Sequence, residues 1–355
     1  MDTLQLKYNF ELPKEFFKDV NPKIRSVLNT YIHNVVYEQT DKYYIVEHDS
    51  KNNTKNIYYI DDFNSKEIYY LLYESLRNCR YELVCELLNI YRDVNISDNN
   101  NLLLNMACHR AQHPIISKLI SAGIDVTANN NTAIKLVSLL FGDYYIDRSD
   151  VIMTLEILLN NGADLHVDND FVLCYASHDI LAFRYLLQLD HKYDITTRNN
   201  YCLLKCVHSY FNNIICQYDK LEGEEFSKIV KRKEKILIDI NINEFVVSDI
   251  IKILLNMGTN VNCNNGYIIN DVVMYGDKYL IKLFIEHGAD LNLVTNNSLI
   301  HIIKSLNNNT IKLLIDNGVN ISKINYEPIK NLQKIEMGNL LLEMGLSYQK
   351  VLDLI

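Results

Sequence analysis

The segment Ile281-Lys-Leu-Phe-Ile-Glu-His-Gly-Ala-Asp-Leu291 decides the fold of this chain. Leu280, Leu283, Phe284 and His287 lie at i, i+3, i+4 and i+7, a spacing that places them on one face of a helix. Gly288 follows the last apolar turn, where the backbone must leave the helix through a left-handed conformation that glycine adopts at little cost. Asp290 then favours a turn. The segment therefore predicts a helix that ends in a glycine and a turn.

The same pattern occurs four more times along the chain. It is found at residues 117–126, 155–165, 251–261 and 311–321. The glycines that follow the five predicted helices are Gly123, Gly162, Gly258, Gly288 and Gly318. The last three lie 30 residues apart, and the wider gaps before them indicate insertions. Self-similarity at this period predicts a stacked repeat architecture.

Clusters of Asn and Asp form a second recurring mark. They stand at residues 129–131, 168–170, 199–200, 264–265 and 296–297, and each precedes a new apolar run. Asn tolerates positive φ and bonds to its own backbone, so these clusters are expected to be hairpin tips or the starts of helices. The predicted unit is a turn, a short helix, a short loop and a second short helix. Helices this short are marginal alone, so stacking on neighbouring units must stabilise them.

This unit resembles the ankyrin repeat. Ser298-Leu-Ile-His301 takes the place of that family's Thr-Pro-Leu-His, and Gly288-Ala-Asp-Leu-Asn292 is similar to its Gly-Ala-Asp-Val-Asn ending. Asn accounts for 44 of the 355 residues, and this Asn- and Ile-rich style resembles the ankyrin proteins of giant DNA viruses. The resemblance covers roughly residues 65–346. It implies an all-α fold, an ankyrin-type helix-turn-helix repeat solenoid, in which His301 and the five glycines have structural roles and His301 bonds backbone groups of adjoining units.

Residues 1–60 do not fit the repeat and predict a small α+β N-terminal cap. Asn21-Pro22 predicts the start of a helix that runs from Lys23 to about Val36. Two β-rich stretches, residues 42–48 and 55–60, flank a polar cluster and predict a hairpin.

The repeat array is expected at residues 61–355. Its predicted units are 66–96, 97–126, 127–165, 166–195, 196–261 with an insertion at 212–246, 262–291, 292–321 and a C-terminal cap at 322–355. A second insertion, Phe141–Asp150, lengthens the inter-helix loop of one unit. Residues 224–239 of the larger insertion predict an extra charged helix.

Composition limits the partners and the location. The formal charge of −9 argues against nucleic-acid binding, which needs a basic surface. No stretch approaches the ~18 uninterrupted apolar residues of a membrane span, and no secretory signal is visible. The eight Cys form no CxxC pair, which indicates reduced thiols in a cytoplasmic protein, in the host cell if the chain is viral. The basic run between Lys228 and Lys235 leaves a nuclear location open.

Catalytic and cofactor motifs are absent from the sequence. There is no P-loop, Gly-x-Gly-x-x-Gly, His-Glu-x-x-His or Gly-x-Ser-x-Gly motif. His109 with His113, and Cys202 with Cys206, are each one helical turn apart, but neither pair has the further ligands that a zinc site needs. The expectation is a non-enzyme without cofactor or metal.

The sequence therefore predicts a monomeric scaffold that binds another protein, of the host or of the virus, through the concave face of the array. The predicted partner-binding residues are those at the turns: Asn130, Asn131, Asn169, Asp170, Asn200, Asn265, Tyr267 and Asn297. The alternative for each Asn is that it only forms its turn.

A rival hypothesis starts from Leu12-Pro-Lys-Glu-Phe-Phe17. This stretch loosely resembles the opening of an F-box, which implies a substrate adaptor for a ubiquitin ligase. The Trp-containing ending of that motif does not follow, since the chain has no Trp.

Overall fold

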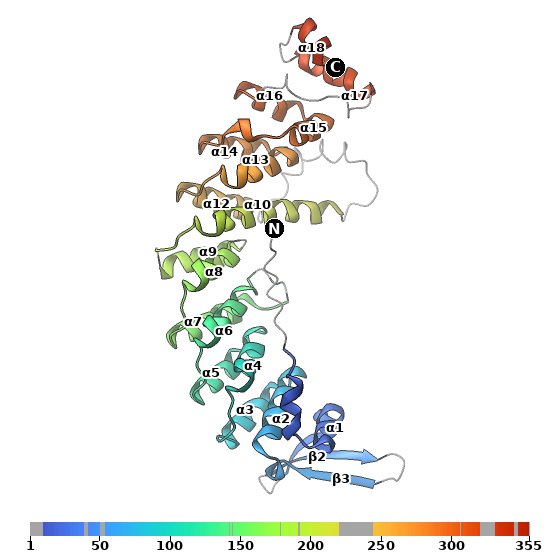
Figure 1. Cartoon of the computed structure of the whole chain (residues 1–355), viewed down its shortest axis with the longest axis vertical. Helices are drawn as coiled ribbons and strands as arrows, with labels where there is room; N and C mark the ends of the chain where they lie inside the picture. Colours follow the sequence, from blue (N-terminus) through green and yellow to red (C-terminus); the bar gives the residue numbers. More distant parts are fainter. Residues whose placement is uncertain are drawn as a thin grey trace. The chain divides into compact units, whose positions relative to one another are not determined.

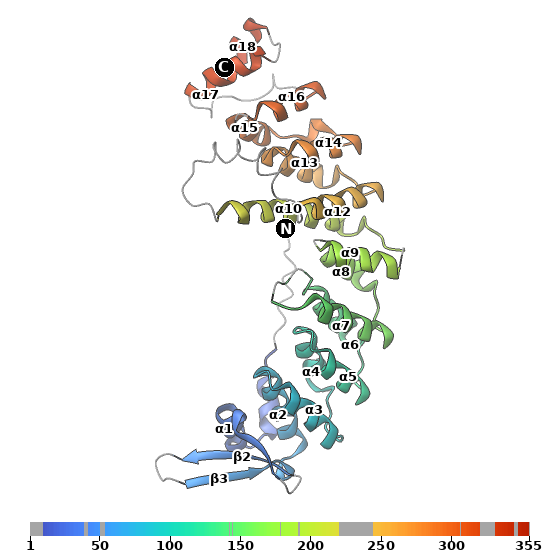
Figure 2. The ribbon, with the colours of Figure 1, turned by 180° about the vertical axis from the view of Figure 1, so that it is seen from behind.

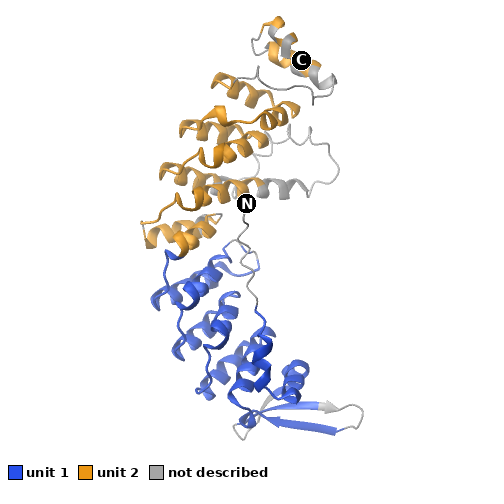
Figure 3. Cartoon of the chain, viewed as in Figure 1, with its two compact units in different colours: residues 1–167 blue, residues 168–355 orange. Residues whose placement is uncertain are grey.

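The computed structural model describes residues 10–38, 42–49, 54–141, 143, 145–177, 179–190, 192–219, 244–305, 307–319, 331–343 and 347–354. Seventeen α-helices and one three-stranded sheet are found in these residues (Figure 1). The mostly helical array that the sequence predicts is therefore confirmed, as is the N-terminal hairpin. The chain divides into two compact units, Met1–Val167 and Asp168–Ile355 (Figure 3), which are described separately below.

The first unit begins with the cap. A 3-10 helix, η1 (Lys14–Asp19), precedes α1 (Pro22–Tyr31), whose first turn is capped by the Asn21 side chain, which accepts a hydrogen bond from the Lys23 amide. The helix ends at Tyr31 instead of continuing to Val36. The β-branched pair Val35-Val36 favours a strand, and it opens β1 (Val35–Glu38), which the sequence analysis missed.

The cap sheet is antiparallel in the order β1-β2-β3. The predicted hairpin consists of β2 (Lys42–Asp49) and β3 (Thr54–Tyr59), in a register that pairs Tyr44 with Tyr59. Val27 and Leu28 of α1 and Ile45 of β2 are buried. This core ties the sheet to α1.

The helical pairs of the first unit follow the cap. They are α2 (Ser65–Arg77) with α3 (Tyr81–Ile90), α4 (Asp98–Cys108) with α5 (His113–Ser121), and α6 (Ala128–Ser138) with α7 (Arg148–Asn160). The first helices α2, α4 and α6 contact one another in sequence, and so do the second helices α3, α5 and α7. Each helix class therefore forms its own layer.

The second unit repeats this two-layer arrangement. Its elements are α8 (Val167–Ala176), α9 (Ile180–Leu189), α10 (Thr197–Asp219), α12 (Glu244–Asn256), α13 (Cys263–Tyr275), α14 (Lys278–Glu286), η4 (Leu291–Leu293), α15 (Asn296–Lys304), α16 (Asn308–Asp316), α17 (Asn331–Glu343) and α18 (Tyr348–Leu354). The first helices α10, α13 and α15 contact one another in turn, whereas α9 contacts α12 and α14 contacts α16 in the other layer (Figure 2). The first helix α10 runs into the predicted insertion, and the helix expected at residues 224–239 lies outside the described residues.

The repeated glycines lie just after the second helices. Gly288 has a φ of +83° and follows α14; its amide donates to the Ile285 carbonyl, and the next amide, of Ala289, donates to the Phe284 carbonyl. The other four glycines of this pattern have φ between +92° and +95°. Each satisfies the last carbonyls of a helix and turns the chain toward the next pair.

Candidate functional site

Five of the described repeats share an unusual turn at the start of their first helices. Three consecutive residues are left-handed in each of five segments: 99–101, 129–131, 168–170, 198–200 and 264–266. Their φ angles lie between +50° and +59°, except at Gly266, where φ is +73°. Left-handed backbone is costly for most L-residues, and Asn and Asp bear it best among those with a side chain. The clusters at 129–131, 168–170, 199–200 and 264–265 are therefore left-handed helix starts and not hairpin tips.

A carboxylate or amide four residues before each triplet closes the turn. Asp194 Oδ1 accepts hydrogen bonds from the Thr196 amide at 3.0 Å and from Thr196 Oγ1 at 2.6 Å. The side-chain bond from Thr196 is the main reason that the pKa of Asp194 lies below its usual value. Asp125 and Thr127 repeat this arrangement in the first unit.

The third residue of three triplets links its turn to the next one. Asn200 Oδ1 accepts from the Asn260 amide at 2.7 Å. Asp170 Oδ2 accepts from the Asp194 amide at 2.7 Å, and Asn131 Oδ1 from the Asp164 amide at 2.8 Å. The side chains of Asn131, Asp170 and Asn200 are thus engaged within the chain, and Asp170 and Asn200 are buried. The geometry at these three predicted positions supports the turn-forming alternative.

The middle residues of the triplets face solvent. Asn130, Asn169 and Asn265 hold this position and are exposed. Asn297 is also exposed but sits differently, because α15 has no left-handed triplet and is capped by Thr295, whose Oγ1 accepts from the Ser298 amide.

The motif that resembles Thr-Pro-Leu-His lies at the start of the same helix α15. Ser298 is buried, and its hydroxyl donates to Asn270 Oδ1 at 2.8 Å. Asn270 Oδ1 also accepts from the Thr295 amide, so the motif is tied to α13 of the preceding pair. His301 follows on the same helix and is half-buried.

Aromatic side chains gather on the first helices of the second unit. The ring of Tyr175 stacks on Phe171 with 4.3 Å between centroids, and lies 5.9 Å from Tyr201 on the next first helix. Further along, the rings of Tyr275 and Phe211 stack at 3.9 Å. We name the half-buried or exposed residues of this surface the aromatic face; it comprises Tyr175, Tyr201, Lys205, His208, Tyr267, Asp271 and Tyr275.

Polar groups are interleaved with these rings. The Lys205 ammonium lies 5.7 Å from the centroid of the Tyr175 ring. His208 Nε2 lies 3.1 Å from Asp271 Oδ2, and the His208 ring meets Tyr267 edge-on at 6.0 Å. The face therefore offers apolar area together with one cation and a paired imidazole and carboxylate.

Three tyrosines of the face, Tyr201, Tyr267 and Tyr275, have raised pKa values and keep their protons at neutral pH. Burial raises the pKa of Tyr201, and the hydrogen bond with Tyr175 raises it further. Burial is also the main cause of the raised pKa values of Tyr267 and Tyr275, with Asp271 adding to it. A neutral phenol both donates and accepts hydrogen bonds, so each ring has a polar tip that suits a protein partner.

Most of the aromatic face was missed from the sequence. Only Tyr267 was among the predicted binding residues. Tyr201 stands at the equivalent position, directly after its polar triplet, so the repeat alignment could have found it. Tyr175 lies one helical turn after Phe171 on α8, so their i, i+4 spacing could have indicated this stacked pair. Tyr275 has no such signal, because its partner Phe211 lies on another helix.

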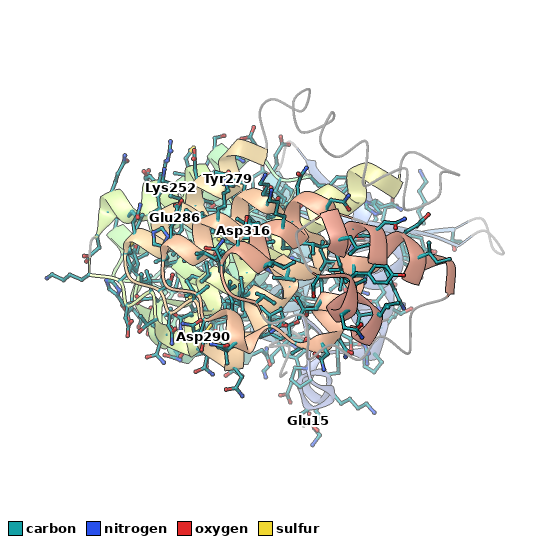
Figure 4. The ribbon with its side chains drawn as sticks, turned by 90° about the horizontal axis from the view of Figure 1, so that it is seen from above. Glu15, Lys252, Tyr279, Glu286, Asp290 and Asp316 are labelled. Atoms are coloured by element: carbon teal, nitrogen blue, oxygen red, sulfur yellow. The ribbon has the colours of Figure 1, made fainter. Side chains whose placement is uncertain are left out.

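The second helices carry a different surface. Tyr279, on α14, is 54% exposed, and Lys252, Glu286 and Asp316 lie on α12, α14 and α16. Figure 4 shows Tyr279 and Lys252 on one side of the stacked helices and the turn residue Asp290 on the other. This outer surface provides a control position for binding experiments.

No group of three or more His, Cys, Asp or Glu that could hold a metal ion is found in the described part of the chain. The two histidines considered in the sequence analysis do not converge: His113 Nε2 lies 3.5 Å from Asp150 Oδ1, and the His109 ring contacts Phe10 at 5.0 Å. Within the ranges given above, no helix is long and apolar enough to span a bilayer.

Comparison with known proteins adds two relatives, both from Acanthamoeba polyphaga mimivirus. The chain is 27% identical over 232 residues to the protein named as ankyrin repeat protein R601, which covers 65% of this chain and 61% of that protein. It is 36% identical over 66 residues to ankyrin repeat protein R602, which covers 19% of this chain and 18% of the relative. No family model matches the chain. These relatives confirm that the chain resembles the ankyrin repeat proteins of a giant DNA virus.

Proposed function

We propose that the chain is a non-enzymatic protein-interaction scaffold and that the aromatic face is a principal binding surface. In the array that the resemblance implies, the first helices and their turns line the concave side. Four tyrosines whose rings contact other aromatic rings lie along the first helices α8, α10 and α13, and this observation carries the proposal. The exposed middle residues Asn169 and Asn265 stand at the starts of α8 and α13 and extend the surface.

Tyrosine suits this role for two physical reasons. Its ring gives a large contact area with few rotatable bonds, so little entropy is lost when a partner binds. Stacking with Phe171 and Phe211 fixes Tyr175 and Tyr275 before any partner arrives. Preorganised surfaces of this kind bind more tightly for the same area.

The test compares three versions of the full chain. The double variant Tyr201→Ala with Tyr267→Ala removes the centre of the aromatic face. Tyr279→Ala removes an exposed tyrosine of the outer surface as a matched control. A partner captured from the native host and identified by mass spectrometry is expected to bind the wild type and the control equally. Its Kd for the double variant should rise at least tenfold, since central Tyr anchors contribute about 2 kcal/mol or more each. Equal Kd values for all three chains would contradict the proposal.

The adaptor hypothesis remains an alternative at the N-terminus. Leu12 and Phe16 are buried, and the Phe16 ring lies 5.5 Å from Tyr69 of α2. The apolar residues that resemble an F-box opening are thus used for packing, which makes this alternative the weaker one. Charge reversal at the exposed Glu15 and Lys18 tests it: loss of a ubiquitin-ligase subunit from the captured complex, with the target retained, would favour the adaptor.

The proposed location is the cytoplasm of the host cell, and the proposed state is a monomer without bound nucleic acid. Light scattering after size exclusion tests the oligomeric state.

A further inference from the structure

A pair of buried thiols lies directly beneath the aromatic face. Cys174, on α8, and Cys202, on α10, have their sulfur atoms 3.0 Å apart. Both residues are at most 1% exposed. They belong to the first helices of consecutive repeats and are 28 residues apart in the chain.

A third thiol nearby is held differently. Cys206 lies one helical turn beyond Cys202, and its sulfur donates to the Ser177 carbonyl at 2.6 Å. This bond directs Cys206 toward the backbone just after α8, whereas Cys174 and Cys202 point at each other. Three thiols thus lie between the same two helices, and Cys174 and Cys202 are the two whose sulfur atoms are close together.

We propose that Cys174 and Cys202 form an oxidisable pair that closes into a disulfide between α8 and α10. A disulfide requires a sulfur–sulfur distance of about 2.05 Å, so closure needs an approach of about 1 Å. Neighbouring helices accommodate such a shift by small side-chain and backbone adjustments.

The oxidant would be a low-molecular-weight disulfide. One thiol loses its proton, and the thiolate attacks the external disulfide, releasing one reduced thiol. The second cysteine then loses its proton and attacks the protein sulfur of the mixed disulfide, which forms the bond between the two cysteines and releases the second small thiol. Two cysteine thiols are oxidised to one disulfide, and one external disulfide is reduced to two thiols. The hydrogen bond with Cys174, together with burial, raises the pKa of Cys202, so the reaction proceeds through local opening of the helices and is slow.

The link would act on the proposed binding surface. Tyr175 and Tyr201 are the sequence neighbours of Cys174 and Cys202, and their rings are already in contact across the same two helices. A covalent bond below them would fix their spacing. This consequence rests on the proposed function, whereas formation of the disulfide does not.

The experiment incubates the full chain with oxidised glutathione in a Cys79→Ser background, because Cys79 is exposed and would link separate molecules. Non-reducing digestion and mass spectrometry are expected to find a peptide joining Cys174 to Cys202, with the chain about 2 Da lighter. The urea midpoint should rise and return after reduction, since the cross-link restricts the unfolded chain.

Two variants complete the test. Cys174→Ser should abolish both the linked peptide and the shift in midpoint, and Cys206→Ser should keep them. If Cys174→Ser does not fold, Cys202→Ala replaces it. Absence of the linked peptide while the half-exposed Cys85 becomes glutathionylated would overturn the proposal, as would a Cys202–Cys206 link. A failed linkage with retained partner binding leaves the proposed function intact, so the two ideas fail separately.

Discussion

Neighbouring residues of the same type have different roles within a left-handed triplet. In the triplet 198–200, Asn199 is exposed and only has to tolerate a φ of +56°. Asn200 has the same backbone conformation but is buried and accepts the Asn260 amide. Substitutions at these two positions can therefore separate the contribution of the left-handed backbone to stability from that of the hydrogen bond.

Glycine at the two positions should have different effects on stability. Asn199→Gly is expected to leave the free energy of unfolding unchanged or to raise it slightly, because glycine adopts positive φ without strain. Asn200→Gly should lower it by about 1–3 kcal/mol, because the Asn260 amide loses its acceptor. Urea denaturation of both variants measures the difference. Equal values would show that the link between turns contributes nothing.

The Asn clusters also show what the sequence could and could not reveal about the site. That 129–131 forms a turn followed from composition and position. Which side chain binds the next turn did not, because Asn130 and Asn131 differ only in the direction in which the left-handed backbone points them. That direction depends on how the repeats stack, and the residue types of the cluster do not reveal it.

Helix α13 and the 3-10 helix η4 come close where a glycine permits it. A Cβ on Gly266 would lie 2.6 Å from the Cβ of Leu293. At Gly258, by contrast, a Cβ would meet nothing within 4 Å, although both glycines have positive φ. The two positions therefore distinguish backbone strain from steric overlap.

Alanine at these glycines should destabilise the chain to different degrees. Gly258→Ala is expected to cost about 1–2 kcal/mol from strain alone. Gly266→Ala should cost about 1–3 kcal/mol more, because Leu293 Cβ cannot move without its backbone. Thermal and urea denaturation would test this order, and a smaller loss for Gly266→Ala would contradict the close packing.

A buried tyrosine of helix α2 should make the stability of the chain fall at alkaline pH. Burial raises the pKa of Tyr70 to about 12, and its hydroxyl donates to Asn29 of α1. A raised pKa means that the folded state holds this proton more tightly than the unfolded chain, whose tyrosines titrate near 10. The stability contributed by neutral Tyr70 is complete below pH 10 or so and is lost as the pH rises toward about 12.

Tyr70→Phe should therefore reduce the loss of stability between these pH values. Its free energy of unfolding at neutral pH should be about 1 kcal/mol lower, since one hydrogen bond is gone. The measurement is urea denaturation at several alkaline pH values. Parallel curves for wild type and variant would show that Tyr70 does not contribute to the transition.

The sequence predicted the presence of the helices better than the residues at which they begin and end. Apolar periodicity and terminal glycines located the second helices, because both signals are local. The end of α1 and the strand β1 were missed, since Val35–Glu38 becomes a strand only by pairing with β2. The length of α10 was also missed, because helix and predicted insertion are continuous there.

Contacts in the array join each element mainly to its neighbours in the repeat order. In the first unit, α5 contacts α3, α4 and α7. Leu119 of α5 is fully buried. Disturbance at this residue should therefore remain local, as in other repeat arrays.

Leu119→Ala is expected to destabilise the surrounding helices by about 2–5 kcal/mol. Hydrogen exchange should show lost protection in α3, α5 and α7 and unchanged protection in α13–α15. The control is Leu283→Ala on α14, which should give the reverse pattern, since Leu283 is buried in the second unit. Uniform loss of protection in either variant would mean that the chain unfolds as one cooperative block.

The links between turns carry a consequence for how such a protein grows. Asn131, Asp170 and Asn200 each accept a hydrogen bond from a main-chain amide at the turn that leads into the following repeat. Every residue except proline offers that amide. For these hydrogen bonds, a repeat can consequently be duplicated, deleted or exchanged by recombination without a matching substitution in the adjacent repeat. The array can therefore gain new surfaces one repeat at a time.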